Sequence, residues 1–191
     1  MSPVRSHARA KGTSQDDLGG ATSNGMSLAE ELKNLGIIKK GKFKLTSGNT
    51  SDFYIDMKMV LGYPKTAELI CNEFCKIIDK KATCIASIGY GGLPLAARVS
   101  LKLGLPLVVV REKPRQHGLK NLIDGYVPAK KDLVAIVDDV FTVGTSMAKI
   151  IKALGKTKAK ILAGYVVVNR GEVSNFKIPI ENLISLEKLT F

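Results

Sequence analysis

Short apolar runs alternate with segments of helical periodicity along most of this chain. The runs predict four strands, at residues 84–89, 105–111, 133–140 and 161–169. Helical spacing of apolar residues predicts helices at 65–80, 93–103 and 147–154, the last ended by Gly155. Strands that are apolar on both faces and separated by helices are typical of a parallel sheet covered on both sides. The pattern therefore predicts an α/β fold with a central, mostly parallel sheet.

The amino-terminal part of the chain follows a different pattern. Residues 1–25 contain few large apolar side chains and cannot bury enough surface to offset the entropy of ordering, so we expect a disordered or added leader. Ser27 and Glu30 have the spacing of a capping box, which predicts a short helix ended by Gly36. Residues 51–60 (SDFYIDMKMV) predict a strand or hairpin. We expect one domain over residues 26–191.

The composition fits a globular protein of 191 residues, with 45% hydrophobic and 24% charged residues. No apolar run approaches the ~20 residues that a membrane-spanning helix needs, and the amino terminus lacks the apolar stretch of a secretory signal. We therefore expect a cytoplasmic protein with no membrane partner. Cys71, Cys75 and Cys84 lack paired spacing and a nearby histidine, which favours buried, reduced thiols over disulfides or a zinc site.

The chain carries 29 basic and 17 acidic residues, a net charge of +12. Residues 1–25 contribute three basic and two acidic side chains, so nearly all of the excess lies in the folded part. A positive charge of this size is compatible with binding to nucleic acid, to an anionic surface or to a phosphorylated substrate. The net charge alone does not distinguish these three kinds of partner. The lysines of residues 152–160 have no aromatic residues between them, so we expect a solvated face and no specific nucleic acid.

Candidate chemistry follows the apolar runs, because parallel sheets bind ligands beyond the carboxyl ends of their strands. Four predicted strands end in polar segments, which are 89–92 (GYGG), Arg111 and the residues after it, 138–146 (DDVFTVGTS), and Asn169–Arg170. In segment 138–146 a buried strand leads into two carboxylates, a short loop and a helix. This segment is the most informative in the chain.

Residues 142–146 predict a phosphate pocket. Gly144 permits close approach of the backbone, and two threonine hydroxyls and one serine hydroxyl add donors to the amides at the positive end of the following helix. Asp138 and Asp139 would repel an anion unless they bind something else, and sugar hydroxyls are their natural partners. The segment therefore indicates a ribose phosphate. The alternative without a ligand is a helix N-cap made of Asp, Thr and Ser. The segment is not a Walker loop, because it lacks the GxxxxGK[ST] pattern.

The segment resembles the phosphoribosyl pyrophosphate signature of type I phosphoribosyltransferases, in which an acidic pair precedes a Thr- and Gly-rich phosphate loop. The acidic pair and three further segments narrow the resemblance to orotate phosphoribosyltransferases, namely 44–56 (KLTSGNTSDFYID), 111–118 (REKPRQHG) and 167–172 (VVNRGE). The resemblance implies an α/β fold with a small N-terminal hood. It also implies Mg²⁺-dependent transfer of ribose 5-phosphate from phosphoribosyl pyrophosphate to orotate, giving orotidine 5'-monophosphate and pyrophosphate in pyrimidine biosynthesis.

The resemblance assigns roles to individual residues. Asp138 and Asp139 would hold the ribose 2'- and 3'-hydroxyls. Arg170 would pair with orotate through two parallel hydrogen bonds, and Tyr54 and Ile55 would lie against its ring. Thr142 is expected to contact both orotate and phosphoribosyl pyrophosphate. The full set of expected contacts to phosphoribosyl pyrophosphate is Arg111, Glu112, Arg115, His117, Asp138, Asp139, Val140, Phe141, Thr142, Val143, Gly144, Thr145 and Ser146.

Residues 112–128 form a long polar connection, which predicts a lid or a disordered segment. In the family this loop closes over the site from the other subunit, so the resemblance implies a homodimer. Arg115 and His117, together with the acidic pair, are then the expected catalytic residues. Cations fixed at the leaving pyrophosphate would stabilise the transition state, and closure would exclude water. The resemblance implies that Mg²⁺ is held through the substrate, with no direct protein ligand.

Several positions depart from the family pattern. Glu112 reverses the charge of a common lysine, whereas Arg115 keeps the charge of another. Some relatives also have lysines where this chain has Thr46 and Gly91. The candidates to supply the missing cationic contacts are Lys44, Lys113 and Lys120.

Two other functions fit parts of the pattern. A purine phosphoribosyltransferase shares the acidic pair and phosphate loop, but Arg170 and the segment 51–56 (SDFYID) argue against its base pocket. A regulatory protein that keeps the pocket and binds nucleic acid would suit the net charge of +12. A charged run is more often a solvated face, so we favour the enzyme.

Overall fold

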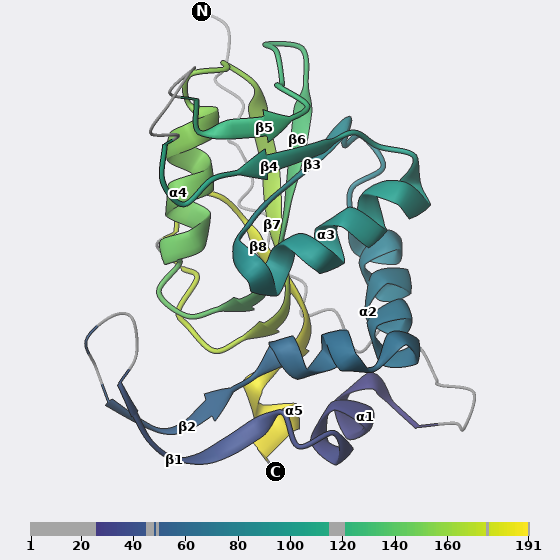
Figure 1. The fold of residues 1–191 in the computed structure, drawn as a ribbon, viewed down its shortest axis with the longest axis vertical. Helices are drawn as coiled ribbons and strands as arrows, with labels where there is room; N and C mark the ends of the chain where they lie inside the picture. Colours follow the sequence, from purple (N-terminus) through teal and green to yellow (C-terminus); the bar gives the residue numbers. More distant parts are fainter. Residues whose placement is uncertain (1–25, 45–47, 49, 115–120, 175, 191) are drawn as a thin grey trace, which may run out of the picture.

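The computed structural model describes residues 26–44, 48, 50–114, 121–174 and 176–190. Figure 1 shows the elements in chain order. They are α1 (Leu28–Asn34), β1 (Ile38–Lys44), β2 (Thr50–Ile55), the 3₁₀ helix η1 (Met57–Gly62), α2 (Pro64–Ile77), β3 (Cys84–Ile88), α3 (Gly89–Leu103), β4 (Leu107–Val110), β5 (Ile123–Gly125), β6 (Leu133–Phe141), α4 (Thr145–Leu154), β7 (Lys160–Asn169), β8 (Ile180–Ser185) and α5 (Leu186–Thr190).

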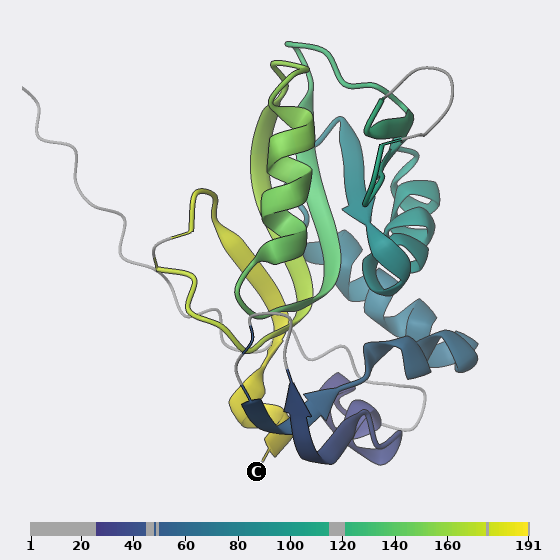
Figure 2. The same cartoon turned by 60° about the vertical axis from the view of Figure 1, so that its left-hand side comes forward.

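Six strands form the central sheet in the order β5-β4-β3-β6-β7-β8. Every neighbouring pair is parallel except β4 and β5, which are antiparallel at one edge. Helices α2 and α3 cover one face and α4 covers the other (Figure 2). Successive residues alternate between the two cores, since Ile85 packs with the α2 and α3 side while Cys84 and Ala86 pack with the α4 side. The predicted α/β fold is confirmed.

A smaller unit lies at the carboxyl end of the sheet, and we call α1, β1, β2 and α5 the hood (Figure 1). Strands β1 and β2 form its antiparallel hairpin. The capping box that begins α1 is present, because the Ser27 backbone N–H donates to Glu30 Oε2 (2.7 Å) and the Glu30 N–H donates to Ser27 Oγ (3.3 Å). The Thr66 hydroxyl donates to Glu31 Oε1 (2.5 Å) and so joins α2 to the hood. Residues 1–25 lie outside the described residues, so the expected leader stays a prediction.

Several elements differ from the expectations drawn from the sequence. Residues 57–62 form a 3₁₀ helix instead of continuing a strand, because Met57 and Val60 are both buried at a spacing of three, which strand alternation does not allow. Helix α3 begins at Gly89 instead of residue 93, since a φ of +73° there turns the chain directly out of β3. Strand β5 lies within the connection read as polar loop, and β8 and α5 were not expected.

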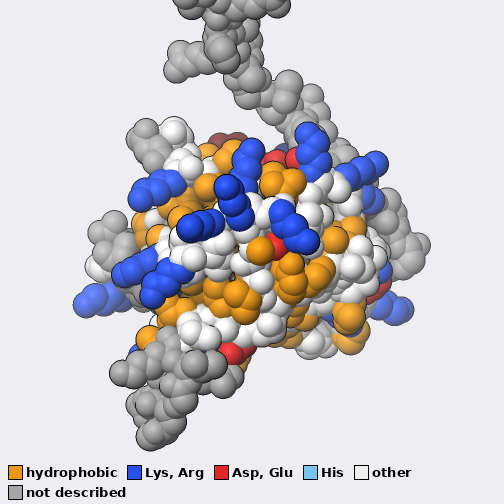
Figure 3. All heavy atoms as spheres, turned by 90° about the horizontal axis from the view of Figure 1, so that it is seen from above, with side chains coloured by type: hydrophobic (Ala, Val, Ile, Leu, Met, Phe, Trp, Pro, Cys, Tyr) orange, Lys and Arg blue, Asp and Glu red, His pale blue; other side chains and the backbone are white. Residues whose placement is uncertain are grey.

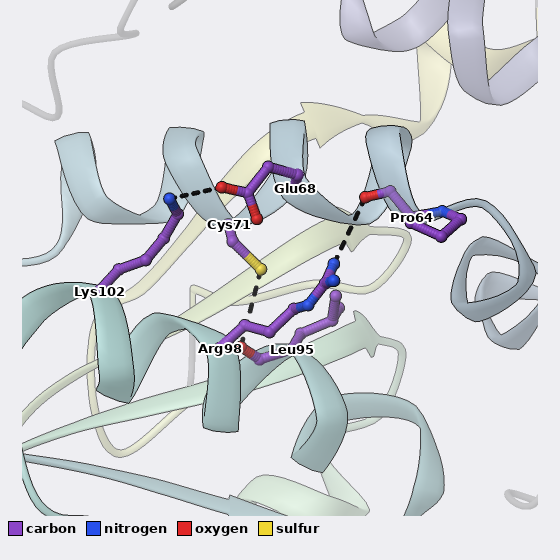
Figure 4. Close-up of polar contacts among 6 residues, drawn as sticks. All are labelled: Pro64, Glu68, Cys71, Leu95, Arg98 and Lys102. Atoms are coloured by element: carbon purple, nitrogen blue, oxygen red, sulfur yellow. Dashed lines mark hydrogen bonds and ion pairs between the residues drawn. The ribbon is translucent and has the colours of Figure 1, made fainter.

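The three cysteines are free, as predicted, with Cys71 and Cys84 buried and Cys75 half-buried. Burial raises the pKa of the Cys71 and Cys84 thiols to about 11, so both stay protonated at neutral pH. Figure 4 shows Cys71 between α2 and α3, where its thiol donates to the Leu95 carbonyl (3.8 Å). The contacts drawn beside it are the Lys102–Glu68 ion pair (2.5 Å) and the Arg98 hydrogen bond to the Pro64 carbonyl (3.4 Å).

Candidate active site

A cleft of about 440 Å³ opens between the hood and the carboxyl ends of β3, β6 and β7. A separate hollow of about 390 Å³ on the hood has one carboxylate and no hydroxyl side chain in its lining, so the reactive groups belong to the cleft. The predicted site residues that line the cleft are Tyr54, Ile55, Glu112, Asp138, Asp139, Val140, Phe141, Thr142, Gly144, Thr145, Ser146 and Arg170. The fold therefore gathers side chains that are up to 116 positions apart in sequence, from Tyr54 to Arg170.

The acidic pair stands at the end of β6, where its carboxylates are fixed by the backbone. The Asp139 N–H donates to Asp138 Oδ1 (3.0 Å) and the Val140 N–H donates to Asp139 Oδ1 (2.8 Å). Asp138 is only 4% exposed. Burial, and then the negative charge of Asp139, raise the pKa of Asp138 well above its usual range. Asp138 therefore binds a proton more tightly than an aspartate exposed to water.

The first turn of α3 packs directly against this acidic pair. A Cβ at Gly91 would overlap the Asp139 carboxylate, and one at Gly92 would lie 2.5 Å from Asp138 Oδ1 and 2.8 Å from its Cα. Glycine is needed at both positions because the carboxylates occupy the space of the missing side chains. Within the GYGG segment, Gly91 and Gly92 thus leave room for the carboxylates of Asp139 and Asp138.

The predicted phosphate loop runs over residues 142–144 and leads directly into α4, as expected. Gly144 has a φ of +75°, and a Cβ there would overlap the Phe176 ring and lie 3.0 Å from Phe141. Only glycine fits this turn without strain. The turn brings the amino end of α4 to the wall of the cleft, where unpaired backbone amides suit an anion.

Arg170 follows β7 and is held in place from two sides. Its guanidinium carbon lies 4.4 Å from the centre of the Phe53 ring, and Nη2 donates to Ser51 Oγ (2.9 Å). Among the described residues it makes no ion pair, so the alternative of a surface salt bridge does not apply. Burial lowers the pKa of Arg170 from a high normal value. A charged, planar donor therefore faces the cleft with its remaining N–H groups.

Sequence reasoning missed two charged cleft residues, Lys58 and Lys149. The ammonium of Lys58 donates to Tyr54 Oη (3.3 Å) and lies 5.8 Å from the centre of that ring. The hydrogen bond with Tyr54 raises the pKa of Lys58, and the charge of Asp139 adds to the rise. Reading 51–60 as a strand hid this pair, whereas the 3₁₀ helix places Lys58 beside Tyr54. For Lys149 the signal was its helical i+4 spacing from Thr145.

Not every predicted contact lines the cleft. Arg111 Nη1 forms an ion pair with Asp124 Oδ2 (2.6 Å) on β5, and Val143 is exposed on the loop. The Nε of Arg111 is buried with no hydrogen-bond partner among the described residues. The unexpected strand β5 therefore decides where this arginine points. Arg115 and His117 lie outside the described residues, and so do Thr46 and Lys120.

Comparison with known proteins gives the family. Residues 62–178 match the model of the phosphoribosyl transferase domain. The orotate phosphoribosyltransferase of Thermoplasma volcanium is 39% identical over 145 residues, 76% of this chain and 85% of that protein. The enzyme of the same name from Methanocaldococcus jannaschii is 34% identical over 152 residues, 80% of this chain and 86% of that protein. This chain belongs to the orotate phosphoribosyltransferase family.

The fold agrees with that assignment. The crystal structure of the orotate phosphoribosyltransferase from Aeropyrum pernix superposes with a TM-score of 0.70 at 29% identity, covering 85% of this chain and 95% of that one. Because the chain belongs to the orotate phosphoribosyltransferase family, the alternative family of purine phosphoribosyltransferases is excluded. None of the helices in the described part of the chain combines the length and the apolar character that a membrane span requires.

The cations of the cleft come from several elements. At two positions where the family resemblance leads us to expect lysines, the chain has Gly91, which admits the Asp139 carboxylate, and Glu112, which lines the cleft. Three ammonium groups reach the cleft from other elements: Lys44 from β1, Lys58 from η1 and Lys149 from α4. Of the compensating residues expected from the sequence, Lys44 lines the cleft and Lys113 is not among its lining residues.

Proposed function

We propose that this cleft transfers ribose 5-phosphate from phosphoribosyl pyrophosphate to orotate, giving orotidine 5'-monophosphate and pyrophosphate for pyrimidine biosynthesis. One observation carries the proposal. The acidic pair at the end of β6, the amino end of α4 and the guanidinium of Arg170 line one cleft. A sugar, a phosphate and a planar anion need these three kinds of group side by side.

In this proposal the substrates are bound by complementary chemistry. The amides at the start of α4, with the hydroxyls of Thr142, Thr145 and Ser146, hold the 5'-phosphate. Asp138 and Asp139 accept hydrogen bonds from the ribose hydroxyls. Arg170 donates two parallel hydrogen bonds to orotate, whose ring lies against Tyr54.

The reaction exchanges one bond at the anomeric carbon for another. A ring nitrogen of orotate gives up its proton to water and forms the new C–N bond while the C–O bond to pyrophosphate breaks, and pyrophosphate leaves with the bonding electrons. The sugar gains positive character as negative charge grows on the leaving group. Fixed carboxylates near the sugar and fixed cations near the pyrophosphate stabilise this separation. We propose Lys44 and Lys58 for the second role, with Arg111, Arg115 and His117 added on the basis of the resemblance.

We also propose that Mg²⁺ acts here, held through the substrate. The described residues contain no group of three or more His, Cys, Asp or Glu side chains that could bind a metal by itself. The donor set still fits a hard cation, since two adjacent carboxylates line the cleft beside the proposed sugar position. When bound, Mg²⁺ supplies positive charge to the pyrophosphate oxygens. The chain's own task is to position the sugar and receive the leaving group.

A base-preference assay tests the proposed function. The purified protein is given orotate or one of the purine bases, with phosphoribosyl pyrophosphate and Mg²⁺. We expect loss of the ultraviolet absorbance of orotate only when all three components are present, with pyrophosphate released in equal amount. Turnover of a purine base without turnover of orotate would contradict the proposal.

Lys58→Met tests the proposed replacement of the family lysines. Removing an ammonium that contacts an anionic substrate costs roughly 1.5–3 kcal/mol, so we expect the kcat/KM for phosphoribosyl pyrophosphate to fall about 10- to 100-fold. Steady-state kinetics measure this. Lys152→Met, an exposed residue in the last turn of α4, is the matched control and should keep wild-type kinetics. Equal losses in both variants would assign the effect to net charge and remove Lys58 from the site.

We further propose a cytoplasmic homodimer. Large apolar side chains are exposed along η1, the start of α2 and α3, with Tyr90 86%, Leu101 82%, Tyr63 46% and Leu61 42% exposed. A hollow lined by Leu61, Pro94 and their neighbours runs between these elements. A second copy of the chain would cover this surface at the edge of the cleft, where Tyr90 lies. Light scattering on the eluting protein should give twice the mass of the chain.

A further inference from the structure

Many lysines lie at the amino ends of the central strands, on the side of the sheet opposite the cleft. Figure 3 looks down on this side of the molecule and shows many Lys and Arg side chains with few acidic ones. Three loops, at residues 78–83, 126–132 and 155–159, precede the adjacent strands β3, β6 and β7 here. Together with the first residue of β7 they present seven exposed lysines, which we call the basic face: Lys80, Lys81, Lys130, Lys131, Lys156, Lys158 and Lys160.

The loops of the basic face are joined into one unit by Asp132. Its buried carboxylate accepts hydrogen bonds from the Thr83 hydroxyl (3.0 Å), the Ala129 N–H (2.7 Å) and the Tyr126 hydroxyl (3.0 Å). Its backbone carbonyl accepts from the Lys160 N–H (3.0 Å). Lysines from three separate segments are therefore held on one surface, with their spacing set by the fold.

The acidic groups of these loops offset only part of the lysine charge, through the electrostatic interaction of Asp132 with Lys131. Only two occur in the three loops, Asp79 and Asp132, and Asp132 is buried with its hydrogen bonds directed inward. The Asp79 carboxylate accepts from the Lys81 backbone N–H (2.9 Å). Within the described residues, none of the seven lysines forms an ion pair. The positive charge of the face is thus available to a partner.

Backbone geometry singles out one of these lysines. Lys158 has a φ of +62°, the one positive φ of a non-glycine residue in the described part of the chain. This left-handed conformation favours glycine or asparagine and disfavours a long side chain. A lysine therefore occupies a strained backbone position on the basic face.

We propose that the basic face binds nucleic acid through the phosphate backbone, without reading bases. The face offers a row of point charges from three loops, which suits a repeating polyanion better than one small phosphate. It presents no arginine fork, and its one aromatic residue, Tyr126, uses its hydroxyl on Asp132. The face therefore has no side chain that could recognise a base edge or stack on an exposed base. A duplex, which presents its phosphates outward and keeps its bases stacked inside, fits such a surface better than a single strand does. The face lies away from the cleft, so bound nucleic acid leaves the active site open.

Fluorescence anisotropy with a labelled DNA duplex of mixed sequence tests this inference. We expect micromolar binding at low salt, similar for unrelated sequences, with the logarithm of the binding constant falling linearly with the logarithm of salt concentration. Lys130→Gln/Lys131→Gln/Lys158→Gln should make that slope shallower by roughly 2 to 3, about 0.9 for each lost phosphate contact. Orotate turnover should stay at the wild-type level in this variant.

The matched control carries the same change of charge elsewhere. Lys39→Gln/Lys40→Gln/Lys42→Gln alters three exposed lysines of β1, and duplex binding should stay close to wild type. If both triple variants bound the duplex equally weakly, the loss would follow from net charge alone, and the inference would be overturned. Displacement of the duplex by poly-glutamate at equal charge concentration would also overturn it, in favour of an acidic protein partner. Lys158→Gly relieves the strained backbone, so we expect a higher Tm together with weaker duplex binding.

Discussion

Asp138→Asn is expected to make the protein more stable and the enzyme much slower. Asparagine keeps the oxygen that accepts the Asp139 N–H, while it removes a buried charge that faces a second carboxylate. We expect about 1 kcal/mol of added stability, a rise in Tm of ~2–4 °C for a domain of this size. Loss of a charged acceptor for the ribose hydroxyls should lower kcat/KM roughly 10- to 100-fold. Thermal melts and steady-state kinetics measure the two effects.

The pH dependence supplies the internal control for Asp138→Asn. The pKa of Asp138 is raised in the folded state, so the folded protein holds this proton more tightly than the unfolded chain does. The contribution of Asp138 to stability therefore falls as the pH rises from about 4, the ordinary Asp value, through the raised pKa. The Tm advantage of the variant should vanish near pH 4 and grow towards neutral pH. An advantage that is constant over this range would show that charge is not its cause.

Arg170→Ala is expected to abolish productive orotate binding while the protein stays folded. The guanidinium rests on Phe53 and Ser51 and makes no ion pair within the described residues, so its free donors are available to the substrate. Removing one partner of a desolvated, hydrogen-bonded charge pair costs about 2–5 kcal/mol. Orotate affinity should fall from roughly 30-fold to several thousand-fold. Calorimetry with orotate measures the loss directly.

Two further variants define what Arg170 contributes. Arg170→Lys keeps the charge but loses the planar fork and the stacking on Phe53, so we expect an intermediate loss. Lys152→Ala removes an equal charge from the exposed last turn of α4 and should leave orotate affinity unchanged. Undiminished affinity in Arg170→Ala would take this residue out of the orotate site.

The most accurate sequence predictions concern features that are local in the chain. The capping box of α1 spans four consecutive residues, and the strand, acidic pair, loop and helix of segment 133–154 are contiguous. Their geometry depends on bonds between near neighbours, so residue type and spacing suffice. Strand β5 shows the opposite case. It has three residues and no hydrophobic period, and it exists because it pairs with the edge of β4.

Cleft residues from the hood needed more than local pattern. Tyr54 and Ile55 were expected only through family resemblance, and Lys58 was missed because its segment was read as extended. The antiparallel hairpin and the 3₁₀ helix bring these side chains under the carboxyl ends of β6 and β7. Arg111 shows the same limit, since the ion pair that orients it comes from a strand that the sequence did not predict.

Residue pattern alone predicted the layered α/β fold, the acidic pair at a strand end, and the short loop that leads from it into α4. Each follows from hydrophobic period or from the chemistry of consecutive residues, which act over one or two turns of chain. Three other features became visible in the folded molecule: the Asp139 carboxylate occupies the space beside Gly91, Lys58 donates to Tyr54, and seven lysines lie on one face. These relations depend on packing between distant segments, because burial and strand pairing set distances that spacing along the chain does not encode.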